Sequence, residues 1–115
     1  MLNLPHQPPI LFAKKILSKS ENSVQVLVEF GSIPTLAMMM EAAAQSSSAF
    51  SDKALEGYVV SCSNLALHSK AKKTIFTAHI TSKMQTDTLH NVHFEIKDED
   101  TLLSSGDILL MLKSD

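Results

Sequence analysis

A single α+β domain, with one long helix against a largely antiparallel sheet, is the fold class that the sequence predicts for residues 1–115. Several separate stretches alternate apolar with polar residues at a period of two, as half-buried strands do. Between them, PTLAMMMEAAAQSSSAF (34–50) is apolar on most sides and long enough to be a helix. No internal repeat, low-complexity tract or linker divides the chain, and its length suits one core.

Two strands are expected before the helix. The segment LPHQPP (4–9) contains three prolines, which exclude a helix there, and 10–17 then reads as a strand or an extended arm. The turn residues KSENS (19–23) separate it from a second strand, whose apolar residues recur at every other position: Val24, Val26, Val28 and Phe30. Gly31 and Ser32 end this second strand.

The helix and four later strands complete the predicted order. Pro34 suits the first turn of a helix, which would run for roughly 16 residues, or about 24 Å. The segment SDKALEG (51–57) ends the helix. The expected strands are 57–67, 74–82, a stretch around Val92, Phe94 and Ile96, and 102–112, with KDED (97–100) as a hairpin turn before the last.

Composition excludes several classes of function. The net charge of −2 gives no basic excess of the kind that nucleic-acid binding needs. The lone cysteine, Cys62, excludes an internal disulfide and suits a reducing compartment, so the cytoplasm is the expected location. The first ten residues do not have the pattern of a signal peptide, and 34–50 is too short and too polar to span a membrane. No metal site is expected, because His90 and His93 are three apart on a strand and point to opposite faces.

One carboxylate lies in the middle of the predicted helix. At about 100° per residue, Glu41, Gln45 and Ser48 fall within an arc of about 60°, and the rest of the circumference is mostly apolar or small. This narrow polar face predicts that the sheet wraps the helix on most sides. Two interpretations stay open: Glu41 and Gln45 form a solvated stripe, or Glu41 lies at the edge of an apolar cavity and transfers protons.

Two stretches resemble motifs of the 3-hydroxyacyl-acyl-carrier-protein dehydratases. LPHQPPILFAKKIL (4–17) resembles their N-terminal motif without a gap, and PTLAMMMEAAAQ (34–45) resembles their helix motif. The resemblance is strongest to a short, divergent branch associated with aryl polyene synthesis. It implies the hot-dog fold, in which a curved antiparallel sheet wraps a central helix and two subunits pair. It also implies that Glu41 faces an acyl thioester at the dimer interface, with the acyl group on acyl carrier protein or coenzyme A and no other cofactor.

The chain departs from this family at the catalytic histidine. In the dehydratases a histidine on the loop before the helix takes the α-proton, and the helix carboxylate helps the hydroxyl to leave. Here that loop is EFGSIP (29–34) and contains no histidine. His6, in the N-terminal motif, is the candidate replacement base, and the alternative is that it positions the N-terminal arm.

The remaining candidate site residues would bind substrate. Gln45 could orient Glu41 or bind a carbonyl, while Pro34 and Met38 lie on the same helical segment. His68 and Lys70 begin a basic loop that would meet a phosphopantetheine phosphate or an acidic carrier protein. The alternatives are a solvated loop for the lysines and a core role for the methionines.

Two function classes remain on sequence alone. The first is an enzyme acting on acyl thioesters in fatty-acyl metabolism, dehydratase-like or thioesterase-like, with Glu41 and His6 as catalytic residues. The second is a non-catalytic acyl-binding or interaction protein that has lost the dehydratase histidine. Both predict a homodimer or a higher even oligomer, with acyl carrier protein as a candidate partner, and neither involves nucleic acid or a membrane.

Overall fold

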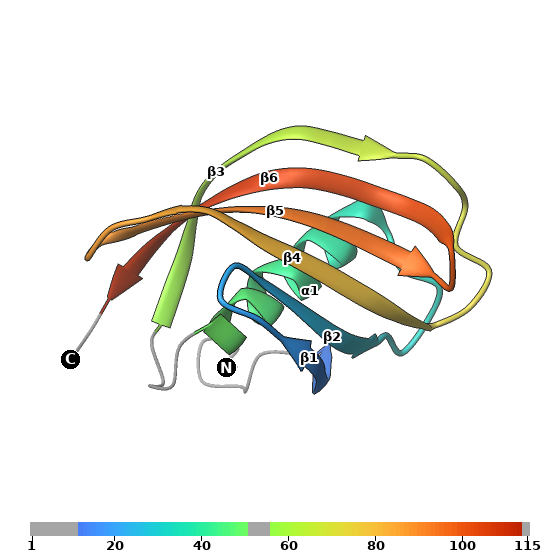
Figure 1. Cartoon of the computed structure of the whole chain (residues 1–115). Coiled ribbons are helices and arrows are strands. Elements are labelled where there is room, and N and C mark those ends of the chain that lie inside the picture. Colours follow the sequence, from blue (N-terminus) through green and yellow to red (C-terminus); the bar gives the residue numbers. More distant parts are fainter. Residues whose placement is uncertain (1–11, 51–55, 114–115) are drawn as a thin grey trace, which may run out of the picture.

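A curved antiparallel sheet surrounds one side of a single helix in the computed structural model, which describes residues 12–50 and 56–113 (Figure 1). The elements follow in the order β1 (Ala13–Lys19), β2 (Ser23–Glu29), α1 (Leu36–Ser47), the short 3-10 helix η2 (Ser48–Phe50), β3 (Glu56–Leu67), β4 (Ile75–Gln85), β5 (Leu89–Asp98) and β6 (Thr101–Lys113). The six strands lie side by side in the order β1-β2-β4-β5-β6-β3, and every neighbouring pair is antiparallel. The predicted α+β class and the predicted order of elements are confirmed.

The helix is shorter than the pattern predicts. It begins at Leu36, because the Thr35 hydroxyl accepts a hydrogen bond from the Met38 backbone N–H at 3.2 Å and caps the first turn. Pro34 therefore precedes the helix instead of lying in its first turn. At the other end, the Ser46 and Ser47 hydroxyls donate to helix carbonyls at 2.7 and 2.6 Å, and the chain tightens into η2.

Strand boundaries also shift by a few residues. The first strand, expected at 10–17, is observed as β1 from Ala13 to Lys19, and residues 1–11 lie outside the described residues. The predicted hairpin turn at 97–100 is confirmed as a tight turn at Glu99 and Asp100, with Glu99 at φ 56°. Loops and strand ends move because hydrogen-bond pairing, rather than local propensity, decides where a strand stops.

The core lies between the concave face of the sheet and helix α1. The strands contribute their alternate apolar residues, which are all buried: Val24, Val26, Val28, Phe76, Ala78, Ile80, Val92, Phe94, Ile96, Ile108 and Leu110. The helix contributes Met39, Ala42 and Ala43, and the two alanines are 0% exposed. Their small side chains let the helix axis approach the sheet closely, as the sequence predicts for this alanine run.

Three phenylalanines join the first strand to this core. The Phe12 and Phe30 ring centroids are 4.8 Å apart, and those of Phe30 and Phe76 are 6.0 Å apart. The Glu29 N–H also donates to the Phe12 carbonyl at 2.9 Å. Tilted aromatic pairs at these separations are favourable beyond the area that they bury. These contacts hold Phe12, just before β1, against the core.

Gly106, on β6, gives the clearest test of how tightly this core is packed. A Cβ atom at this position would lie 2.5 Å from Leu65 Cδ2 and 2.8 Å from Phe94 Cε2. Gly106→Ala is therefore expected to lower the free energy of unfolding by about 1–3 kcal/mol, because neighbouring side chains must leave their preferred positions. Urea unfolding measures the change. Gly31→Ala is the matched control: no atom lies within 4 Å of its added Cβ, so a change within about 0.5 kcal/mol is expected.

Candidate functional site

Helix α1 presents Glu41 away from the sheet. The buried residues Met39, Ala42 and Ser46 face the core, whereas Ala37 and Glu41 are exposed on the opposite side. The Glu41 carboxylate therefore points to the surface that its own sheet leaves uncovered. Within one protomer Glu41 is exposed, whereas Gln45 is half-buried. Burial of Glu41 by a second subunit stays a prediction.

Gln45 has a structural partner that the sequence did not indicate. Its side-chain oxygen Oε1 accepts hydrogen bonds from the backbone N–H groups of Phe12 and Ala13, at 2.7 and 3.2 Å. Both contacts are partly buried and join residues more than 30 positions apart in the chain. Gln45 therefore fastens the start of β1 to the helix turn that follows Glu41. Its expected role in substrate binding stays a prediction, now with this oxygen already engaged.

The other side of the helix faces β3. There the Cys62 thiol donates to the Met40 sulfur at 3.1 Å, and Cys62 is half-buried. Of the remaining helix candidates, Pro34 is buried and Met38 is half-buried against the core. The three consecutive methionines at 38–40 are thus mostly part of the core, which was the alternative to a role in substrate binding. His6 lies outside the described residues.

His68 and Lys70 lie at one end of the sheet, in the loop between β3 and β4. Figure 1 shows this loop at the same end of the fold as the start of α1. His68 Nε2 is 2.8 Å from the Ser105 hydroxyl, and both His68 and Lys70 are exposed. The structure therefore places these two candidates together and brings them to the helix N-terminal end, while their part in substrate binding stays a prediction.

Among the described histidines, His90 and His93 lie on the two faces of the sheet. His90 is buried in the core, with Nε2 2.9 Å from the Ser82 hydroxyl and its ring edge-on to Phe50 at 5.3 Å. Burial lowers the pKa of His90, so it favours the neutral ring. His93 lies on the opposite, outer face, as the spacing of the two residues predicts. Among the described residues, no hydrogen bond or ion pair joins a histidine to Glu41.

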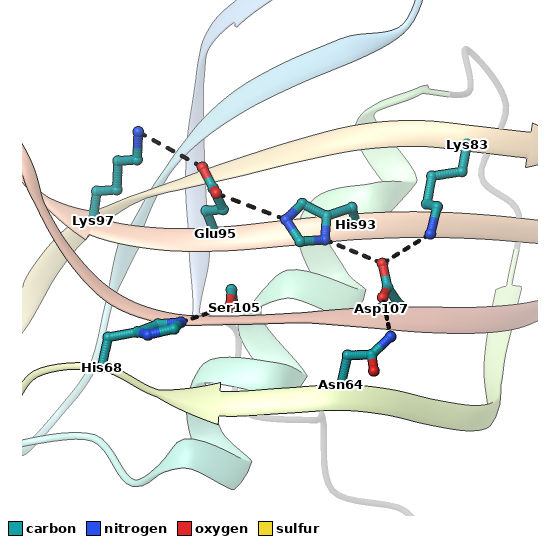
Figure 2. Close-up of polar contacts among 8 residues, drawn as sticks. All are labelled: Asn64, His68, Lys83, His93, Glu95, Lys97, Ser105 and Asp107. Carbon is teal, nitrogen blue, oxygen red and sulfur yellow. Dashed lines mark hydrogen bonds and ion pairs between the residues drawn. The ribbon is translucent and has the colours of Figure 1, made fainter.

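A polar network on the outer face of the sheet is the feature that sequence reasoning missed (Figure 2). Asp107 on β6 is its centre: its carboxylate accepts from Asn64 at 2.9 Å and Lys83 at 3.2 Å, and lies 3.1 Å from His93 Nδ1. The Asn64 hydrogen bond is the main cause of a lowered pKa at Asp107, and the contacts with His93 and Lys83 add to it while burial opposes them. The alternation of His93, Glu95 and Lys97 along β5 was a visible signal, and Glu95 pairs with both of the others, but Asp107 and its other partners lie on other strands.

Two further observations concern the described residues alone. They contain no group of three or more His, Cys, Asp or Glu side chains placed to hold a metal ion. In that same part of the chain, no helix has the length and apolar character required to cross a membrane.

Comparison with known proteins rests on structure. No protein-family model and no curated protein sequence matches the chain. Among solved structures, the dehydratase heterocomplex ApeI:P from Xenorhabdus doucetiae aligns with a TM-score of 0.81 at 15% identity, over 97% of this chain and 89% of that one. Cj0977, a sigma28-regulated virulence protein from Campylobacter jejuni, aligns at 0.73 and 13% identity, over 100% and 94% of the two chains. A mutant of the thioesterase PA1618 from Pseudomonas aeruginosa aligns at 0.69 and 10% identity, over 84% and 78%.

These similarities settle the architecture. The structural neighbours are hot-dog proteins that include dehydratases and thioesterases, and the present chain shares their helix and curved six-stranded sheet. At identities this low the likeness concerns the fold alone. The chain has the hot-dog fold.

Gln45 provides the test of how the N-terminal strand is fastened beside Glu41. Gln45→Leu leaves the Phe12 and Ala13 N–H groups without this acceptor, so the free energy of unfolding is expected to fall by about 1–3 kcal/mol. Gln45→Glu is the matched control, because it keeps a side-chain oxygen at the same reach and should retain most of the stability at neutral pH. Equal stability of the leucine variant and wild type, measured by urea unfolding, would contradict the assigned role.

Proposed function

We propose that this chain is an acyl-thioester-binding hot-dog protein in which Glu41 supplies the acid–base group. The observation behind the proposal is the position of Glu41: a carboxylate exposed on the helix face that its own sheet leaves open. Glu41 is the one charged residue of helix α1, and its exposed position suits a site that a second subunit completes. The structural likeness to dehydratases and thioesterases supports the same class of substrate.

Two reactions fit a carboxylate in this place. In a dehydratase, a base removes the α-proton of a 3-hydroxyacyl thioester, and the Glu41 carboxyl group gives a proton to the departing hydroxyl, which leaves as water. In a thioesterase, the Glu41 carboxylate takes a proton from water, whose oxygen attacks the thioester carbonyl and releases the thiol. The second reaction needs no histidine, which suits a chain whose β2–α1 loop has none. The acyl group would be carried on the phosphopantetheine of acyl carrier protein or on coenzyme A, without another cofactor.

A second copy of the chain is the proposed partner, and the two edges of the sheet differ in a way that favours one of them. The β1 edge contains the exposed Lys14, Lys15 and Lys19, which oppose pairing with another strand, whereas register irregularities occur in both edge strands. The β3 edge contains no lysine or arginine and exposes four apolar side chains: Val59, Val60, Leu65 and Leu67. A two-fold dimer through β3 would continue the sheet and bury these side chains.

We propose that the carrier of the acyl group approaches the site at the loop between β3 and β4. Lys70 and His68 are exposed there, at the end of the sheet where α1 begins. An exposed lysine can attract a phosphopantetheine phosphate or an acidic carrier protein, mainly by raising the association rate. The half-buried, unpaired thiol of Cys62 suits a reducing compartment such as the cytoplasm.

The missing histidine favours a second candidate function. A chain that lacks the dehydratase base could bind acyl groups without turning them over, or could lend Glu41 to a different hot-dog subunit that has the histidine. The neighbour from Xenorhabdus doucetiae is a dehydratase heterocomplex, which gives the mixed assembly a structural precedent. Either version predicts that the purified chain alone binds acyl thioesters without consuming them.

Glu41→Gln tests the proposed chemistry. Glutamine keeps the size of glutamate but cannot exchange the proton, so turnover of acyl thioesters is expected to fall by about 10² to 10⁴. Thermal melting should be unchanged or rise, because the side chain is exposed within the protomer and a neutral amide is easier to bury at the proposed interface than an ionised carboxylate. The measurement is turnover of 3-hydroxyacyl and saturated acyl thioesters of coenzyme A by wild type and variant.

Two comparisons separate the alternatives. His6→Ala should silence a dehydratase that uses this residue as its base and leave a thioesterase driven by Glu41 largely active. Wild type that binds both thioesters and consumes neither would favour the second candidate, and a Glu41→Gln variant as active as wild type would remove Glu41 from the mechanism.

Val60→Lys tests the proposed dimer. The exposed lysines of β1 oppose strand pairing at that edge, and a lysine at position 60 should do the same on β3. The dissociation constant of the dimer is therefore expected to rise about tenfold or more in sedimentation experiments. Ile16→Lys on β1 is the matched control, because Ile16 and Val60 are both 51% exposed. The control should leave the dimer intact, and equal effects of the two substitutions would contradict a β3 interface.

A further inference from the structure

Strand β3 is interrupted near its end by a bulge. Ser63 pairs with Asp107 and Ala66 pairs with Ser105, so two residues, Asn64 and Leu65, stand opposite the single residue Gly106. Asn64 has φ 55°, in the left-handed region that asparagine tolerates better than most residues. The extra residue bends the strand and changes which side chains face each side of the sheet.

The bulge turns Asn64 and Leu65 to opposite faces. Asn64 reaches the outer face, where its side-chain nitrogen Nδ2 donates to Asp107 Oδ2 at 2.9 Å. Leu65 packs over the inner face of Gly106. Because glycine has no side chain, the Leu65 side chain fits in the space that a Cβ atom at position 106 would need. Leu67, two residues on, pairs with the buried Ser104 and is exposed on this inner side at the edge of the sheet. The exposed apolar side chains at this end of β3 therefore owe their direction to the bulge.

Asp107 is held from the other strands as well. Lys83 on β4 donates to its Oδ1 at 3.2 Å, and His93 on β5 lies 3.1 Å from the same oxygen (Figure 2). Glu95 approaches the other nitrogen of His93 at 3.7 Å. Side chains of two central strands, β4 and β5, thus hold the Asp107 carboxylate, which also accepts the hydrogen bond from Asn64. The network spans β4, β5, β6 and β3. It links the geometry of an edge strand to the rigid middle of the sheet.

We propose that Asn64 and Asp107 are positioning residues for assembly: their hydrogen bond holds the bulge that sets the register in which β3 pairs with a second copy of this chain. The inference rests on the proposed β3 dimer. β3 pairs with β6 from Glu56 to Ser63 with one register irregularity at Val60, and the bulge at Asn64 and Leu65 then interrupts the ladder and aims Leu65 and Leu67 at the inner side. The partner strand pairs with the first part and packs against the second.

Substitutions at Asn64 separate backbone shape from side-chain bonding. Asn64→Val is expected to raise the dimer dissociation constant about tenfold or more, because a β-branched residue does not adopt φ near 55° and the bulge must rearrange. Asn64→Gly should weaken the dimer less than valine does, since glycine adopts this conformation freely but loses the hydrogen bond to Asp107. Asp107→Ala removes the acceptor from the other side and should weaken the dimer in the same direction as valine. Sedimentation measures the dissociation constants.

Hydrogen exchange measured on the whole chain tests the conformation of the bulge without depending on dimer formation. At a concentration where each variant is monomeric, amides of β3 on both sides of position 64 should exchange faster in Asn64→Val than in wild type. Lys73→Ala is the matched control, because it breaks an exposed ion pair with Asp98 at 3.3 Å that does not touch the network; it should change neither measurement.

Two results would overturn the inference, and they are distinguishable. A stable wild-type dimer whose affinity is the same in Asn64→Val would refute the role of the bulge and leave the β3 dimer standing. A wild type that stays monomeric at high concentration would refute both the dimer and the inference. Hydrogen exchange would still detect the rearranged β3 strand of Asn64→Val in that case.

Discussion

Close contact between helix α1 and the concave face of one antiparallel sheet is the constraint on which the rest of the structure depends. Ala42 and Ala43 are fully buried, so the helix lies near enough to contact every strand of the sheet. A flat sheet could not surround a helix in this way, and the twist and register irregularities of the outer strands provide the curvature. Everything at the candidate site follows from which part of the helix this sheet covers.

The sheet covers one side of the helix, and the two flanks are used differently. Gln45 binds the backbone of the first strand, whereas Met40 contacts Cys62 on the last strand of the sheet order. Glu41 lies between these flanks and has no cover of its own. The same geometry that stabilises the protomer thus leaves one carboxylate and one apolar sheet edge exposed together. A second subunit at that edge is the simplest way to bury both.

The two faces of the sheet have separate roles. The inner face is apolar and packs the core, where burial lowers the pKa of His90. The outer face is polar: Asp107 pairs across strands with Lys83 and His93, and Glu95 contacts His93 along β5. Exposed ion pairs contribute little to stability one by one. In this sheet the polar network is proposed to fix a backbone conformation instead. Its hydrogen bond from Asn64 to Asp107 lies at the bulge of the edge strand β3.

The sequence by itself determined the α+β class, the order of elements, the alternating core and the likeness of two motifs to the hot-dog dehydratases. These features are local, because strand alternation and helix periodicity are written in neighbouring residues. Only the tertiary structure decided that Gln45 binds the backbone at Phe12, that Asp107 gathers partners from three other strands, and that Glu41 is exposed in the protomer. Each of these depends on residues far apart in the chain whose pairing is fixed by strand register, and register is set by the whole sheet at once.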